Sequence, residues 1–168
     1  GSCSSLSLLG NGNCNAACNN LACSFDNRDC PTVDIKVSPI SGNDSNTDVA
    51  GSFQTLARAF HVACAGFDDC VSIQIVGGEK DESTFEVQNK KINVSATAGG
   101  SGKAYLEGKM RFSNVQGQIQ SVVFSGAQPV VFDRGTSLVL DYCVVKTSAQ
   151  LQVRNSGIAI SNSILNDH

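Results

Sequence analysis

The chain has 168 residues, of which 41% are hydrophobic and 16% are charged, so its length fits one domain plus a small module and its composition is that of a folding protein. Its formal net charge is −3 and its lysines and arginines are scattered, so it lacks the basic patch that binds nucleic acid or an anionic membrane. No apolar run reaches the roughly 18 residues that cross a bilayer, and we expect no membrane span in this segment.

The cysteine content indicates the compartment. The chain carries eight cysteines, five of them within the first 30 residues, which is far more than a cytosolic protein of this size usually has. Two Asn-X-Ser triplets, beginning at Asn43 and Asn93, are acceptor sites for N-glycosylation. So short a pattern also arises by chance, and the cysteines therefore carry the argument. We predict a glycoprotein that is secreted or lies on the extracellular face of the cell surface.

Residues 3–30 form a cysteine-rich segment that is too small to bury a core of its own and depends on disulfides or a metal. Its five cysteines are separated by 10, 3, 4 and 6 residues, with LGNGNCN ahead of CNNLAC and DNRDC at the end. This pattern resembles a Lin-Notch repeat (LNR), the small module of Notch-type receptors and other surface proteins. The family usually has six cysteines, and the first of them has no counterpart here.

The LNR resemblance implies a disulfide pattern. It pairs Cys3 with Cys18 and Cys14 with Cys30. It leaves Cys23 without its usual partner, and the sequence leaves open whether that partner was cut away or replaced.

The same segment raises a choice between a catalytic site, a zinc site and a calcium site. It holds no histidine and no lysine to act as a general base, and oxidised cysteines cannot supply the thiolates that zinc prefers. The resemblance implies one calcium ion, held by oxygen ligands from Asn11, Asn13, Asn15, Asp26 and Asp29, with Asn13 acting through its backbone carbonyl. We expect weak binding, because asparagines replace two of the family's aspartates. The alternative is a turn held only by disulfides.

Composition changes abruptly after residue 30, and there we place the boundary between the LNR-like module and a second domain at 31–168. Residues 32–40 have the rhythm of an opening strand, and residues 41–52 form a polar loop rich in turn formers. An amphipathic helix is predicted at about 52–66, with Ser52 as its N-cap. Its apolar residues recur at helical spacing: Phe53, Leu56, Ala57, Phe60 and Cys64.

Two further cysteine predictions concern this second domain. Cys64 and Cys70 flank a short loop after the helix, and this spacing favours a local disulfide. Cys143 lies inside an apolar strand pattern, where a buried thiol is expected.

Beyond the helix the chain reads as short strands separated by Gly, Asn and Ser. The apolar segments are 71–78, 91–100, 110–117, 121–126, 129–135, 137–145, 151–157 and 158–165. Residues 137–145 superpose on residues 157–165 without gaps, at an offset of 20 that places Leu138 on Ile158. A period near 20 with a strand and a turn in each unit is typical of a solenoid. A β-sandwich with evenly spaced strands can produce a similar internal sequence repeat.

The order of an opening strand, a polar loop, a helix and then repeated strands resembles the pectin-lyase-like family over roughly residues 32–168. The resemblance implies an all-β fold, a right-handed parallel β-helix (β-solenoid) whose N-terminal end is closed by the capping helix. The strand pattern is still repeating near residue 168, with no second capping segment. We therefore expect either a truncated β-helix that is part of a larger chain or a last coil without a cap.

Two classes of function fit this organisation. The first is a noncatalytic extracellular module, a structural spacer or an adhesion surface for a protein or glycan ligand. The alternative is a carbohydrate-active enzyme, a polysaccharide lyase or hydrolase of the pectin-lyase-like fold. Its candidate catalytic residues are Lys109, Arg111, Asp133, Arg134 and Asp141. We favour the noncatalytic class, because no aspartate pair recurs in adjacent coils and the Asp-Arg-Gly triplet is also an ordinary turn.

Overall fold

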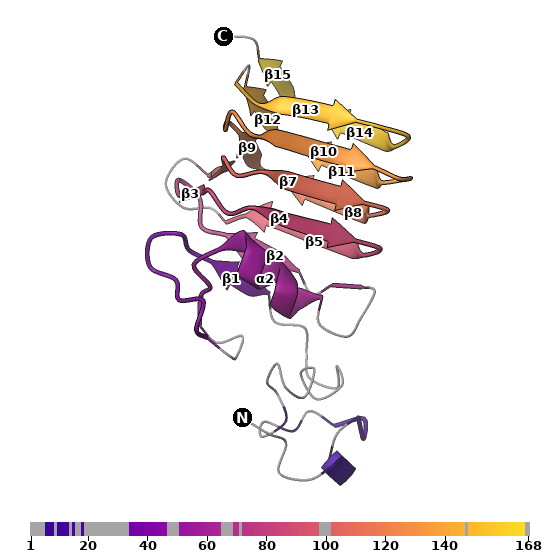
Figure 1. Cartoon of the computed structure of the whole chain (residues 1–168). Coiled ribbons are helices and arrows are strands. Elements are labelled where there is room, and N and C mark those ends of the chain that lie inside the picture. The colour runs from indigo at the N-terminus through magenta and orange to yellow at the C-terminus, as the bar shows by residue number, and fades with distance from the viewer. Residues whose placement is uncertain are drawn as a thin grey trace.

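The computed structural model describes residues 6–8, 10–13, 15, 18, 34–46, 51–64, 69–70, 72–97, 102–146 and 148–166. Successive strands of the chain lie in three different sheets, and the described strands pair in parallel with their equivalents in the neighbouring coil. The result is a parallel β-helix of about four coils from residue 73 onward, as the sequence pattern predicted. Figure 1 shows the coils stacked one above another from the N-terminal to the C-terminal end.

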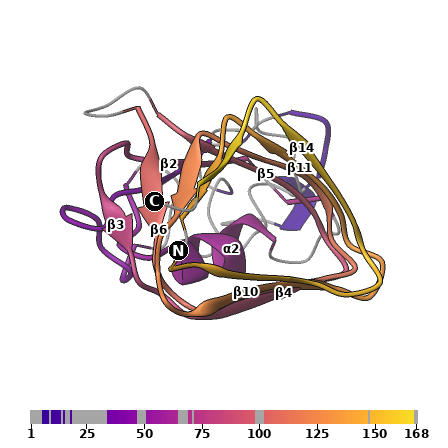
Figure 2. The same ribbon diagram turned by 90° about the horizontal axis from the view of Figure 1, so that it is seen from above.

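Three parallel sheets run along the β-helix, and Figure 2 shows them as the sides of each coil. Sheet A contains β1 (Ile35–Val37), β2 (Ile73–Ile75), β5 (Lys91–Ala96), β8 (Gln116–Gln120), β11 (Ser137–Asp141) and β14 (Gly157–Ser161). Sheet B contains β3 (Lys80–Asp81), β6 (Ala104–Leu106), β9 (Val122–Phe124), β12 (Val144–Lys146) and β15 (Ile164–Asn166). Sheet C contains β4 (Phe85–Gln88), β7 (Met110–Ser113), β10 (Pro129–Asp133) and β13 (Gln150–Val153).

The 20-residue repeat in the sequence is the register of the last two described coils. Leu138 of β11 pairs with Ile158 of β14, and Val144 of β12 pairs with Ile164 of β15. Equivalent residues of neighbouring coils lie about 4.8 Å apart, so inward-facing apolar side chains form continuous columns. The predicted solenoid is therefore confirmed down to the register of these strands.

An aromatic column fills the interior behind sheet C. Phe112 stacks on Phe132 of the next coil with ring centroids 5.2 Å apart. Phe85, in the preceding coil, meets Phe112 edge-on at 5.9 Å, and Phe60 of the helix lies 5.1 Å from Phe85. The column therefore joins the helix to three successive coils.

The corner between sheets C and A depends on residues with a left-handed backbone. Asn89, Asn114, Arg134 and Asn155 occupy it in successive coils, with φ between 48° and 54°. Asparagine adopts this conformation more readily than most residues with a side chain. Asn114 Nδ2 also donates to Asn89 Oδ1 at 2.8 Å, so these two corner side chains bond between neighbouring coils.

The helix α2 (Leu56–Ala63) is shorter than the predicted range of 52–66. Its N-cap is Thr55, not Ser52, and the Thr55 hydroxyl accepts a backbone N–H of the first turn at 3.1 Å. Phe53 lies outside the helix because it forms a parallel β-bridge with the end of β1. The extended backbone that this bridge requires moves the start of the helix three residues later than helical spacing alone predicts.

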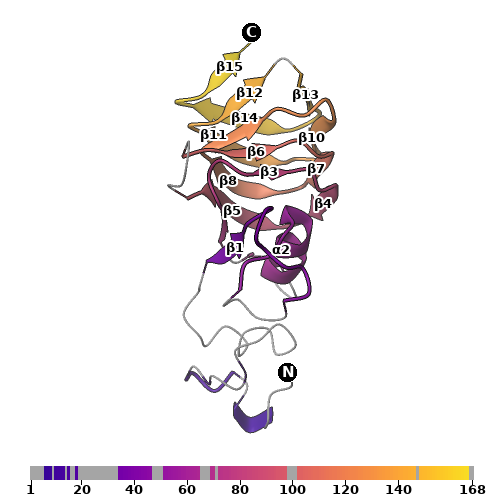
Figure 3. The same ribbon diagram turned by 90° about the vertical axis from the view of Figure 1, so that its left-hand side faces the viewer.

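Helix α2 nevertheless closes the N-terminal end of the β-helix as predicted. Phe53, Leu56 and Phe60 are 0%, 1% and 5% exposed, and the helix contacts β1, β2 and β4. Figure 3 shows it at the N-terminal end of the stack of coils. No helix among the described residues is long and apolar enough to cross a bilayer.

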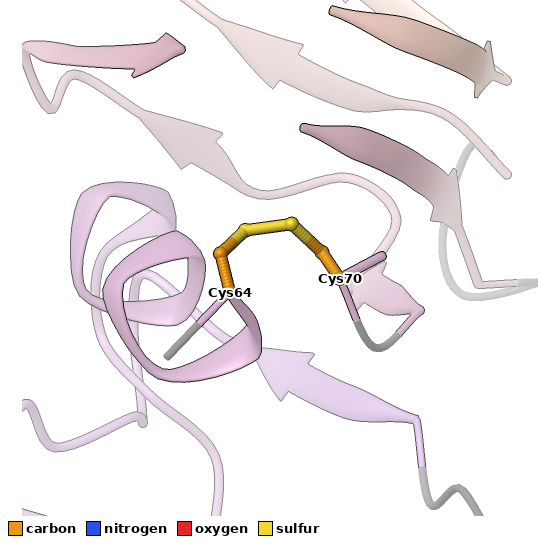
Figure 4. The surroundings of a disulfide bond; sticks show 2 residues. All are labelled: Cys64 and Cys70. Carbon is orange, nitrogen blue, oxygen red and sulfur yellow. A yellow bond between two sulfur atoms is a disulfide. The ribbon is translucent and has the colours of Figure 1, made fainter. Parts of the chain in front are cut away.

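The cysteines of the β-helix domain behave as the sequence indicated. Cys64, at the C-cap of α2, forms a disulfide with Cys70, with their Cα atoms 4.3 Å apart (Figure 4). Cys143 is a buried free thiol, and its Sγ lies 3.3 Å from the backbone oxygen of Ile119. Burial raises the pKa of the Cys143 thiol, so it stays protonated and unreactive.

Candidate functional site

The described part of the N-terminal module gathers oxygen atoms around one asparagine. Asn15 Nδ2 lies 2.6 Å from the backbone oxygen of Asn13 and 3.0 Å from that of Leu8. Asn11 Oδ1 is 3.2 Å from the same nitrogen. Three oxygens thus converge on an amide nitrogen that carries only two hydrogens. In the structure these oxygens accept from the Asn15 amide and form a hydrogen-bonded turn, and the calcium ion stays a prediction.

Other predicted residues of this module lie outside the described residues. They include the two carboxylate ligands, Asp26 and Asp29, and the cysteines Cys3, Cys14, Cys23 and Cys30. Cys18 is buried and disulfide-bonded, and its predicted pairing with Cys3 stays a prediction. Within the described ranges, no three side chains of His, Cys, Asp or Glu gather closely enough to hold a metal ion.

The structure brings two of the five candidate catalytic residues together. Arg111 of β7 donates from Nε and Nη2 to Oδ2 of Asp133, at the end of β10, at 3.2 and 2.5 Å. Glu86 of β4 lies 3.5 Å from Arg111 Nε on the other side. Together, Glu86, Arg111 and Asp133 form a charge ladder that crosses three coils on sheet C.

The hydrogen bonds of the ladder favour the charged forms of Arg111 and Asp133. The hydrogen bond from Arg111 holds the pKa of the Asp133 carboxyl below its usual value, and the same bond raises the pKa of the Arg111 guanidinium. The Asp133 side chain is only 9% exposed. A carboxylate with a lowered pKa is ionised near neutral pH, so it cannot donate a proton as a general acid and is a weaker proton acceptor than an ordinary carboxylate. The pair is therefore suited to joining coils.

The other three candidates lie at three different corners of the coil. Arg134 is exposed at the corner between sheets C and A, and Lys109 precedes β7 at the corner between sheets B and C. Asp141 lies where sheet A turns to sheet B, and its Oδ1 accepts from Ser161 Oγ at 2.8 Å and Asn162 Nδ2 at 3.0 Å. The bond from Asn162 is the main reason that the pKa of Asp141 is lowered. The five candidates do not converge in one groove.

Surface grooves follow the corners of the coils. One groove of about 500 Å³ at the corner between sheets B and C is lined in part by Glu82, Glu107 and Lys109. Another, of about 300 Å³, lies at the corner between sheets C and A and is lined by amides and lysines: Asn89, Lys90, Lys91, Asn114 and Gln116. Neither lining includes Asp133 or Asp141, so neither groove assembles the predicted catalytic set.

Both predicted glycosylation asparagines are exposed, in different settings. Asn43 lies in the polar loop, where its Oδ1 accepts the backbone N–H of Ser45 at 2.9 Å. Asn93 lies within β5, in register with Gln118 of β8. The first triplet is therefore part of a turn, and the second is part of a paired strand.

Three carboxylates with structural roles were not predicted from the sequence: Glu86 of the ladder, and Asp44 and Asp81, which anchor the helix. Asp44 Oδ1 accepts the two backbone N–H groups just before the helix at 2.8 and 2.9 Å. Asp81 Oδ2 accepts the N–H of the first helical residue at 2.6 Å. These carboxylates lie 11 and 25 residues from their partners, so no local capping motif marked them. The sequence offered one indication of this role, which is that Asp44 lies in the polar loop that leads to the helix.

Comparison with known protein families identifies the N-terminal segment. Residues 1–31 match the family model of the Notch LNR domain. This match confirms the predicted LNR. The LNR is a Notch-type extracellular domain, and the match covers the cysteine-rich segment that precedes the β-helix. No curated protein and no solved structure matches the chain. The pectin-lyase-like resemblance of the second domain is supported by its parallel β-helix architecture.

Proposed function

We propose that this chain is a noncatalytic module of a secreted or cell-surface protein, in which the β-helix is a rigid spacer or adhesion surface and the LNR a calcium-stabilised cap. The observation that carries the proposal is an LNR match followed by a β-helix whose candidate catalytic residues are spread over three corners and one paired ladder. Sheets that continue from coil to coil give a stiff rod, because each coil is held by its neighbours. A rod of this kind suits the display of a surface to a protein or glycan ligand.

The LNR is proposed to hold one calcium ion through Asn11, Asn13, Asn15, Asp26 and Asp29. The oxygens of Asn11 and Asn13, which lie side by side around the Asn15 amide, support the part of this ligand set that they supply. Bound calcium supplies the charge that orders a segment too small to order itself. Two carboxylates rather than four face the ion, so the affinity is expected to be low.

Titration calorimetry and thermal unfolding in calcium test this part of the proposal. Calcium at millimolar concentration should release or absorb heat and raise the melting temperature of the module in a dose-dependent way. Asp29→Ala should abolish that rise and leave the unfolding transition of the β-helix unchanged. Neither heat nor stabilisation, in protein whose disulfides are shown to be formed, would mean that the segment is only a disulfide clip.

The carbohydrate-active enzyme is the second candidate, and the observation that favours it is the parallel β-helix architecture that the pectin-lyase-like resemblance implied. An assay on a panel of acidic and neutral polysaccharides, with calcium present, separates the two classes. The noncatalytic proposal predicts no turnover. Reproducible turnover that is lost in Asp133→Ala or Asp141→Ala, in variants that still melt cooperatively, would overturn it.

A further inference from the structure

The side-chain amide of Asn11 lies directly before a glycine. The dipeptide Asn-Gly occurs once in the chain, at Asn11–Gly12, and both residues are exposed. The backbone nitrogen that follows an asparagine can attack the amide carbon of its side chain, and glycine shields this nitrogen least because it has no side chain. A Cβ on Gly12 would meet nothing within 4 Å. The Asn11 amide is therefore accessible to the backbone nitrogen of its own neighbour.

The side-chain oxygen of Asn11 is surrounded by hydrogen-bond donors. The backbone N–H of Asn13 donates to Asn11 Oδ1 at 2.9 Å, and Asn15 Nδ2 lies 3.2 Å from the same oxygen. Attack on the amide carbon places negative charge on this oxygen. Donors that already point at an oxygen where charge develops lower the barrier, as the oxyanion hole of an enzyme does. The turn therefore activates the Asn11 amide toward attack.

The reaction at Asn11 needs only water. The backbone nitrogen of Gly12 loses its proton to solvent and forms a bond to Cγ of Asn11. The bond from Cγ to Nδ2 then breaks, ammonia leaves with a proton from solvent, and a cyclic imide joins the two residues. Water opens this imide at Cγ to give aspartate, or at the main-chain carbonyl to give isoaspartate. The net change consumes a water molecule and releases ammonia, and no oxidant or reductant takes part.

We propose that Asn11 is a self-modification site, at which the folded chain converts its own asparagine to aspartate. The turn then holds a carboxylate where it held a neutral amide. The consequence for calcium rests on the proposed function, in which residue 11 is a ligand of the ion. An added carboxylate raises the charge of the ligand set, and calcium affinity rises with that charge. The modification therefore strengthens the calcium site as the protein ages.

The chain offers a matched comparison at Asn43. Asn43 is also exposed, and its Oδ1 accepts the backbone N–H of Ser45, two residues later, at 2.9 Å. The residue that follows it is Asp44, whose carboxylate accepts hydrogen bonds from the segment just before α2. The Asp44 side chain shields its own backbone nitrogen, and these bonds fix its position. We therefore expect Asn43 to stay unmodified while Asn11 is converted.

Peptide mass spectrometry of the whole folded chain tests the modification. The chain is produced without glycosylation, its disulfides are shown to be formed, and it is incubated at physiological temperature and pH. The peptide that holds Asn11 should exchange the mass of NH for that of O several times faster than the peptide that holds Asn43. An endopeptidase that cleaves before aspartate but not before isoaspartate separates the two products. An unchanged Asn11, or equal rates at the two asparagines, would overturn the proposal.

Two variants test whether the turn activates the amide. Asn15→Ala removes one donor to Asn11 Oδ1 and should slow the conversion by about two- to tenfold, which is the rate equivalent of one hydrogen bond. Asn13→Ala is the matched control, because it keeps the backbone N–H that donates to this oxygen, and it should convert as the wild type does. Faster conversion in Asn15→Ala than in wild type would show that the turn protects Asn11, and would overturn its activating role.

A third variant separates the modification from the calcium site. Asn11→Asp supplies the modified chain directly, and calorimetric titration should show that it binds calcium more tightly than wild type. Conversion of Asn11 in a chain whose Asn11→Asp variant binds calcium no better would support the modification and contradict the calcium ligand set. Tighter calcium binding by Asn11→Asp, in a chain whose Asn11 stays unchanged on incubation, would support the ligand set and overturn the self-modification.

Discussion

Asp81, a buried residue of β3, accepts the backbone N–H of Leu56 at 2.6 Å and so ties the first residue of α2 to the first coil. Its other carboxylate oxygen accepts the backbone N–H of Ser83 at 2.8 Å. The first N–H groups of a helix have no partner within the helix, and a negative charge is favourable at that end. The cap is therefore held by a charged contact from the neighbouring coil as well as by apolar burial.

Replacing Asp81 should loosen the cap. We expect Asp81→Ala to lower the free energy of unfolding by about 1–3 kcal/mol, because it leaves the buried N–H of Leu56 without an acceptor. Urea unfolding measures this change. Glu82→Ala is the matched control, because Glu82 is the exposed neighbour in sequence and should cost little. Equal effects of the two substitutions would show that the carboxylate does not hold the helix.

The close stacking of the coils leads us to expect that a side chain at Gly126 would destabilise the fold. A Cβ on Gly126 would lie 2.0 Å from the backbone oxygen of Glu107 in the preceding coil. Because backbone cannot move aside as a side chain can, Gly126→Ala should destabilise the β-helix by about 1–3 kcal/mol. A Cβ on Gly157 meets nothing within 4 Å, so Gly157→Ala should be neutral or slightly stabilising. Thermal unfolding of the two variants compares them, and a stable Gly126→Ala protein would contradict the observed coil spacing.

The sequence predicted those parts of the fold where the repeat is regular. The pairing of Ser137 with Gly157 spans 20 residues, and the whole register of β11 on β14 could be read from apolar spacing. The pairing of Lys91 with Gln116 spans 25 residues, because the coil between them has a longer loop. The repeat length therefore changes along the chain, and the earlier coils could not be recognised from a constant period. The strands β3 and β6 have two and three residues, too few to show an alternating pattern.

The candidate site was harder to predict than the fold. The Arg111–Asp133 pair is diagonal across two strands, 22 residues apart, and depends on a register that only the folded coils supply. Asp141 and Lys109, the candidates at the other corners of the coil, lie away from this pair. Scattered charges on a solenoid can meet only when their positions along the coil agree as well as their coil number.

The Arg111–Asp133 pair should give stability that depends on pH. The pKa of Asp133 is lower in the folded chain than in the unfolded chain, where it is about 3.9. Its ionisation therefore stabilises the fold above that value, and the contribution is lost as the pH falls through the folded pKa. The difference in melting temperature between wild type and Asp133→Asn should be large near neutral pH and should shrink below about pH 4.

Two variants check that this pH dependence belongs to the pair. Arg111→Ala should destabilise the fold near neutral pH, because it leaves the buried Asp133 carboxylate without its cation. Lys109→Ala removes a positive charge two residues away and should have little effect. A double-mutant cycle without coupling between Arg111 and Asp133 would contradict the role of the pair.

The two glycosylation triplets should differ in occupancy. Asn43 lies in an exposed turn, whereas Asn93 lies within a strand that is paired on both sides. An enzyme that modifies an asparagine needs access to a segment of backbone, and a loop offers this more readily than a central strand. In a eukaryotic secretory host, mass spectrometry should find glycan mainly at Asn43, and Asn43→Gln should remove most of the added mass. Full occupancy of Asn93 would contradict this prediction.

The last prediction concerns Asn15, whose amide lies among three oxygen atoms. The Asn15 amide nitrogen donates to the backbone oxygens of Leu8 and Asn13 and lies 3.2 Å from Asn11 Oδ1. Asn15→Asp replaces that donor with a carboxylate, which the surrounding oxygens repel unless a cation lies between them. The variant should therefore be less stable than wild type in chelator and should bind calcium more tightly, because an added carboxylate strengthens a calcium site.

Thermal unfolding of the LNR in chelator and in millimolar calcium measures both effects of Asn15→Asp. The gain in melting temperature on adding calcium should be larger for the variant than for wild type. Asn15→Ala is the matched control, because it removes the donor without adding charge and should lose stability in chelator without a compensating gain in calcium. If Asn15→Asp and Asn15→Ala respond alike to calcium, the converging oxygens do not form part of a calcium site, and the asparagine amide serves only to hold the turn.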